Sequence, residues 1–67
     1  MNIDIRKNIH DNFLQTDKEE IRSSIEDALK SKEELALPGL GVFFEILWME
    51  SSLEEKEQIL NRIKNGI

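Results

Sequence analysis

Hydrophobic and polar residues alternate with helical spacing along four successive stretches of the chain. In the first, predicted to run from about Ile3 to Phe13, apolar side chains recur every four residues at Ile5, Ile9 and Phe13. Residues four apart lie on the same face of a helix, so this spacing predicts one apolar stripe. No stretch shows the strict alternation of a β-strand. The pattern therefore predicts an all-α protein.

The second predicted helix opens with a capping box. The Thr16 hydroxyl would accept a hydrogen bond from the Glu19 backbone N–H, and the Glu19 carboxylate would accept one from the Thr16 N–H. We expect this helix to fade between Ser31 and Ala36, because Pro38 disfavours helical geometry in the residue before it. Its apolar stripe consists of Ile21, Ile25, Ala28 and Leu29.

The third predicted helix, from about Leu40 to Glu50, is apolar on two sides at 100° per residue. Its broad face consists of Leu40, Phe43, Phe44, Leu47 and Trp48. A narrower second face consists of Val42, Ile46 and Met49. One face can serve the internal core, but the second needs another cover, either the first helix or a second copy of the chain. The three residues of the second face are therefore candidate interface residues.

The fourth predicted helix begins with a second capping box, formed by Ser52 and Glu55. Gly66 suits a C-terminal cap. Its apolar stripe consists of Leu53, Ile59, Leu60, Ile63 and Ile67. Together the four stretches predict a single helical domain over residues 1–67, a small bundle of four short helices around a central apolar helix.

Size and charge narrow the ways in which such a bundle can be stabilised. A chain of 67 residues has one core, which supplies only about 3–5 kcal/mol. It contains no Cys, so close helix packing or self-association must replace disulfides. We therefore expect a homo-oligomer, such as a homodimer. The formal net charge of −5 repels phosphate overall, and no membrane-spanning or targeting segment is visible, which favours an intracellular protein.

The residues that could carry chemistry are few. His10 is the only His and has no Cys beside it, so it cannot anchor a transition-metal site by itself. Adjacent acidic residues on a helix point about 100° apart and do not form facing carboxylate pairs. We expect no catalytic residue, no metal site and no cofactor. Trp48 could stack on a base, but no positive charge is near it in the sequence, so core packing is favoured.

The segment Leu37–Gly41, with the sequence LPGLG, resembles the hairpin of the helix-hairpin-helix DNA-binding family. That resemblance implies that backbone N–H groups of Gly39, Leu40 and Gly41 could approach a phosphate. However, apolar residues follow where that family has polar or basic ones. The alternative is a structural turn, in which Pro38 fixes one torsion and Gly39 tolerates a positive φ.

A second resemblance spans the whole chain. It begins at Met1–Arg6, with the sequence MNIDIR, and is strongest at Leu37–Trp48, where LPGLGVFFEILW resembles an LPGLGV-F-E-W signature. An acidic final helix ending in Gly66 completes it. In these features the chain resembles the small acid-soluble spore protein I family of spore-forming Firmicutes. The resemblance implies a protein made in the forespore and housed in the spore core, and it implies no reaction.

Two hypotheses about function follow. The first is a non-enzymatic spore protein that acts through protein–protein contact, as a homodimer or with another spore protein, using Val42, Ile46 and Met49. The alternative is nucleic-acid binding through the LPGLG segment. The salt dependence of binding distinguishes the two hypotheses, because binding through phosphates weakens steeply as the salt concentration rises.

Overall fold

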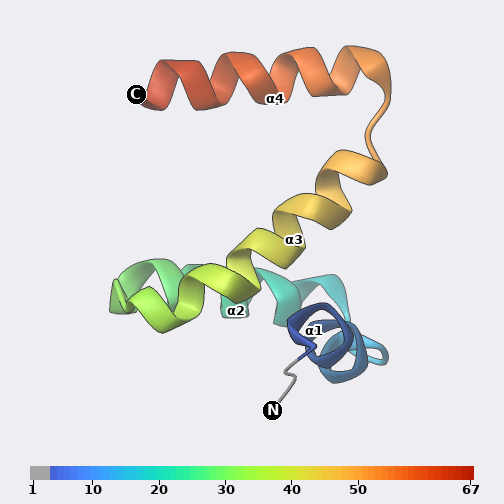
Figure 1. The fold of residues 1–67 in the computed structure, drawn as a ribbon, viewed down its shortest axis with the longest axis vertical. Coiled ribbons are helices and arrows are strands. Elements are labelled where there is room, and N and C mark those ends of the chain that lie inside the picture. The colour runs from blue at the N-terminus through green and yellow to red at the C-terminus, as the bar shows by residue number, and fades with distance from the viewer. Residues whose placement is uncertain (1–3) are drawn as a thin grey trace.

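The computed structural model describes residues 4–67, and these form four α-helices and one short 3₁₀ helix (Figure 1). The elements are α1 (Ile5–Phe13), α2 (Lys18–Ser31), η1 (Glu34–Ala36), α3 (Leu37–Met49) and α4 (Leu53–Gly66). No strand occurs within residues 4–67, so the predicted all-α class is confirmed. Ile3, the predicted start of the first helix, lies outside the described residues.

The first two helices begin at aspartates. The Asp4 side chain accepts a hydrogen bond from the Lys7 N–H at 2.9 Å and caps α1. Asp17 caps α2 in the same way, accepting from the Glu20 N–H at 2.9 Å. The predicted capping box at Thr16 was wrong, because the carboxylate of the next residue takes that role and also favours the positive end of the helix dipole.

The fourth helix begins and ends close to its predicted limits. The Ser52 hydroxyl accepts from the Glu55 N–H at 3.1 Å, and the Glu55 carboxylate accepts from the Ser52 N–H at 2.8 Å. The predicted capping box is therefore confirmed. Gly66 is the last helical residue, and Ile67 takes the cap position that the sequence analysis assigned to Gly66.

The turn predicted at Leu37–Gly41 does not form. Helix α3 begins at Leu37, about three residues earlier than expected, and Pro38 lies in its first turn, where its missing N–H would have no partner in any case. No glycine in residues 4–67 has a positive φ. The chain reverses earlier, at Lys32, whose left-handed backbone (φ 54°) ends α2, and η1 then leads directly into α3.

The tightest packing is between α1 and the first half of α3. The Phe13 and Phe43 rings meet edge to face, with centroids 5.1 Å apart and planes 75° apart. A Cβ added at Gly39 would lie 3.4 Å from the Ile9 Cδ1 atom, so the glycine lets α1 approach closely. Val42 is the one buried hydrophobic residue among those described.

The bundle is open on the side of α4. In Figure 1, α3 leads away from α1 and α2, and α4 lies beyond its far end. The Cα radius of gyration is 13.2 Å, against about 11 Å for a compact domain of this length. The predicted small bundle with α3 at its centre is confirmed, but it encloses little of its apolar surface.

The two glycines of α3 provide a matched test of the α1–α3 contact. Gly39→Leu should weaken the fold, because its side chain would be forced against Ile9, whereas Gly41→Leu should be tolerated because nothing lies within 4 Å of a Cβ there. Gly41→Ala should stabilise α3 by about 0.5–1 kcal/mol, since glycine is costly inside a helix. Urea unfolding curves followed by circular dichroism measure all three. Equal loss of stability in the two leucine variants would contradict this packing.

Candidate interaction surface

The three predicted interface residues occupy different environments on α3. Val42 is only 8% exposed and lies beside Ile5 and Arg6 of α1, which is one of the two covers that the sequence analysis allowed. Ile46 is 46% exposed and Met49 is 80% exposed. The first therefore belongs to the packing of the chain itself, and the other two remain accessible.

The broad apolar face of α3 is also only partly covered. Phe44 and Leu47, on the face that the sequence analysis assigned to the internal core, are 42% and 50% exposed. Both line an open groove between α1, α2 and α3 and are not enclosed by these helices. The second half of α3 thus carries apolar side chains on both faces that the rest of the chain covers only in part.

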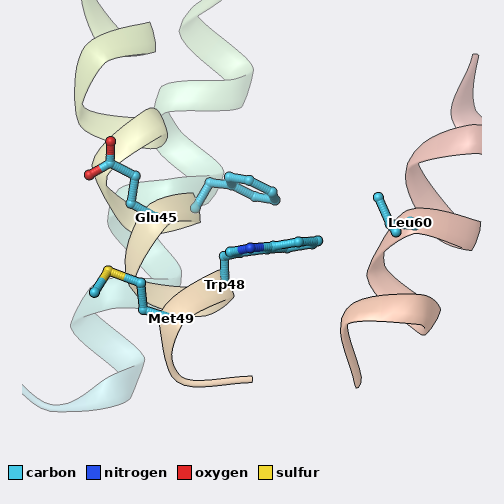
Figure 2. Close-up of a pocket in the computed structure, with 5 residues that line it drawn as sticks. Glu45, Trp48, Met49 and Leu60 are labelled. Carbon is cyan, nitrogen blue, oxygen red and sulfur yellow. The ribbon is translucent and has the colours of Figure 1, made fainter. Parts of the chain in front are cut away.

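A hollow of about 370 Å³ separates this half of α3 from α4. Its walls are Phe44, Glu45, Trp48, Met49 and Leu60. Figure 2 shows the Trp48 ring pointing toward Leu60 of α4, while Glu45 and Met49 extend from the other side of α3. Trp48 thus lies at the edge of an open hollow, and its predicted place in a closed core is not what the structure shows.

Two aromatic contacts hold Trp48 in place. Its ring lies 5.9 Å from that of Phe44, centroid to centroid, with the planes tilted by 31°. The Lys56 Nζ atom lies 5.4 Å from the Trp48 ring centroid, which is within cation–π range. The second contact joins α4 to α3. The sequence analysis did not predict it, because seven residues separate the two side chains and the bend that brings them together is not visible in the sequence.

A second groove lies between α1, α2 and α3. Its volume is about 610 Å³, and its walls are almost entirely apolar. They are formed by Ile9, His10, Phe13, Leu14, Ile21, Ile25, Leu40, Phe43, Phe44, Ile46 and Leu47. Phe44 lines both this groove and the hollow beside α4, so the two form one apolar surface along α3. We call the part formed by Phe44, Trp48, Met49 and the facing side of α4 the α3–α4 surface.

The one charged side chain that lines the hollow is held by another helix. Arg6 donates two hydrogen bonds to the Glu45 carboxylate, at 2.7 and 2.6 Å, and ties α1 to α3. These hydrogen bonds lower the pKa of Glu45, the Arg6 charge adds to the effect, and partial desolvation opposes it. Glu45 is therefore ionised near neutral pH and engaged by Arg6, and the rest of the hollow is apolar.

The residues proposed to approach a phosphate lie in succession near the N-terminus of α3. Gly39 faces Ile9 of α1, Leu40 lines the groove between the first three helices, and Gly41 borders open space. All three are helical. Because the resemblance to a DNA-binding hairpin depended on a non-helical turn, the structure leaves the backbone geometry of that hairpin unsupported.

Side chains that could take part in catalysis or metal binding lie away from the α3–α4 surface or have no suitable neighbours. The His10 Nδ1 atom lies 3.7 Å from the Asp11 carboxylate on an exposed part of α1. Within residues 4–67, no three His, Cys, Asp or Glu side chains gather in a way that could hold a metal ion. In the same residues, no helix is both long enough and apolar enough to span a bilayer.

Comparison with known proteins assigns this architecture to a family. The sequence pattern of the family described as "Small, acid-soluble spore protein I" matches residues 3–67. The chain belongs to the small acid-soluble spore protein I family. This confirms the resemblance found at Met1–Arg6 and Leu37–Trp48. The family assignment identifies a spore protein and does not itself identify a mechanism.

Curated relatives of the same name resemble the chain over its whole length. The protein of Halalkalibacterium halodurans is 37% identical, with 100% of this chain and 98% of the relative aligned. That of Bacillus subtilis is 36% identical over 100% and 94%, respectively. That of Geobacillus kaustophilus is 34% identical over 100% and 97%. No solved structure matches the chain.

The α4 capping box should make this helix sensitive to acid. The Ser52 N–H donates to Glu55 and lowers the pKa of that carboxyl, so its stabilising effect is complete above the ordinary Glu pKa and is lost as the pH falls through the lowered value. We expect the helical circular-dichroism signal of the wild type to lose a component on acidification that Glu55→Gln lacks. The amide can still accept from Ser52 but does not titrate in this range. Identical acid titrations of the two proteins would contradict this role of Glu55.

Proposed function

We propose that this protein is a non-enzymatic component of the spore core that acts through protein–protein contact, using the α3–α4 surface. The observation that carries the proposal is the exposure of apolar side chains on both walls of the hollow, with Phe44 42% exposed on α3 and Leu60 46% exposed on α4. Exposed apolar patches of this kind mark interaction sites in soluble proteins.

The make-up of the surface supports contact more than chemistry. Its centre is built from two aromatic rings and aliphatic side chains, the residue types that dominate the energy of protein interfaces. Its one carboxylate already accepts two hydrogen bonds from Arg6. Such a surface can enclose an apolar side chain of a partner, and it presents no pair of groups arranged for proton transfer or nucleophilic attack.

The family membership supports the cellular setting. The relatives are named as small, acid-soluble spore proteins, which indicates a protein of the spore. We propose the spore core as the location of this chain and the forespore as its place of synthesis. The acidic balance of the sequence, with 14 Asp and Glu against 9 Lys and Arg, favours a protein partner over a phosphate backbone.

Cross-linking in forming spores tests the contact surface directly. A photoreactive amino acid placed at Met49 should form adducts with protein, because this side chain borders the hollow and is 80% exposed. The same group placed at Gln58, an exposed position of α4, serves as the matched control. No excess of protein adducts at Met49 over Gln58 would contradict the proposal.

A salt titration tests the nucleic-acid alternative. We expect the purified protein to show no association with duplex DNA at low ionic strength, where phosphate contacts are strongest. Binding to DNA that weakens steeply as salt is added would favour the alternative. If Gly39, Leu40 and Gly41 contact the phosphates, Gly41→Glu should then reduce DNA binding.

A further inference from the structure

We propose that the occupant of the α3–α4 surface is a second copy of this chain, whose α4 packs antiparallel against α4 of the first. This inference rests on the function proposed for that surface and names its partner. Three features of the described residues carry it: the amount of exposed area, the spacing of the apolar side chains of α4, and the distribution of charge along that helix.

The first feature is an excess of accessible surface. The chain exposes 6143 Å². A compact monomer of 7.8 kDa would expose about 4,400 Å², so the excess is about 1,700 Å² per chain. A stable interface of standard size removes about 800 Å² from each partner, and obligate dimers remove more. A second copy therefore has enough uncovered surface to form a stable dimer.

The second feature is the spacing of apolar residues on α4. Leu53, Leu60 and Ile67 recur every seven residues, and Ile63 lies three residues after Leu60. This is the spacing of a helix that packs along another helix. All four side chains are exposed, with Leu53 at 80% and Ile67 at 93%. They form a seam that stays at least 45% exposed at each position, although Trp48 of α3 points toward Leu60 across the hollow (Figure 2).

The remaining position of this seam explains how α4 stays attached to α3. Lys56, three residues after Leu53, would be out of place in an apolar seam. Its ammonium group instead lies over the Trp48 ring. The contact between Lys56 and Trp48 thus anchors one edge of α4 to α3 and leaves the rest of the seam free for the second copy.

The third feature is the charge pattern, which selects the antiparallel direction. The first half of α4 is acidic, with Glu54, Glu55 and Glu57 around Lys56, and the second half is basic, with Arg62 and Lys64. A two-fold axis turns one copy against the other and places unlike halves side by side. A parallel pair would instead align like charges along the seam.

One pair of charges fits this arrangement in particular. Glu57 and Lys64 lie seven residues apart, on the same flank of the seam and on opposite sides of Leu60. A two-fold axis at Leu60 brings Glu57 of each copy beside Lys64 of the other. Both side chains are exposed, and neither takes part in an ion pair within the part of the chain that the structure describes.

The molar mass of the full chain in solution, measured by sedimentation equilibrium over a concentration series, tests the dimer. We expect the wild type to form dimers. Leu60→Glu should raise the dissociation constant at least a hundredfold, because the two copies would bring their new carboxylates together at the axis. Gln58→Glu adds the same charge away from the seam and should leave the dissociation constant within about threefold.

Charge reversal tests the direction of packing. Glu57→Lys alone and Lys64→Glu alone should each raise the dissociation constant about three- to tenfold, since every substitution creates two like-charge pairs. The double variant Glu57→Lys with Lys64→Glu restores unlike pairs and should bring the constant back toward the wild-type value. Additive losses in the double variant would overturn the antiparallel arrangement.

The dimer can be disproved without disproving the proposed function. A wild-type chain that stays monomeric at every concentration, with Trp48 fluorescence typical of a buried indole, would show that α4 closes on its own α3 and would overturn the dimer. Protein adducts at Met49 in spores would then still support a different partner. A dimer that Leu60→Glu does not dissociate would likewise overturn the second copy as the occupant of this seam.

Discussion

The packing of α1 across the first half of α3 is the contact on which the rest of the structure depends. It is the place where the chain encloses apolar surface, through the edge-to-face contact of Phe13 with Phe43 and the close approach at Gly39. The Arg6–Glu45 ion pair helps to orient α1 on α3 but contributes little stability, since both side chains are accessible to solvent. Without this contact α3 would be an apolar helix in water.

That contact also explains why the second half of α3 stays uncovered. A nine-residue α1 is about 13 Å long at 1.5 Å per residue and cannot span all of α3 while α2 occupies the same end. The connection of Glu50, Ser51 and Ser52 then directs α4 outward. The apolar faces of α3 and α4 are left facing a hollow, and this is the physical origin of the proposed interaction surface.

An open bundle of this kind links stability to assembly. A small chain with a single buried hydrophobic residue among those described, Val42, has little intrinsic stability. Burial of exposed leucine and isoleucine side chains by a partner would add about 25 cal/mol for each Å² of apolar surface removed from water. For such a protein, folding and association are parts of one equilibrium. In the proposed dimer, the like net charge of the surface outside the seam would keep separate dimers apart.

Local signals in the sequence predicted local structure well where one residue had one clear role. Ser52 and Glu55 formed the expected capping box, and α2 ends at Ser31, within the expected range. The reason given for that end was wrong, because Leu37, the residue before Pro38, is itself helical. The same reasoning failed at Thr16, where the neighbouring Asp17 was a better cap, and at the LPGLG segment. There the glycines suggested a turn, but a proline in a first helical turn is also favourable, and the demand for close packing against Ile9 explains Gly39 without one.

The sequence by itself determined the helices, their amphipathic stripes and the family, because hydrophobic spacing, capping residues and the LPGLGVFFEILW segment are local properties of the chain. Only the tertiary structure decided which face of α3 is covered. Val42 and Met49 are equivalent in the sequence pattern, yet one is buried beneath α1 and the other projects from the surface. The length of α1 and the direction of the connection before α4 made that difference, and both depend on how helices are placed in space rather than on the pattern within any one of them.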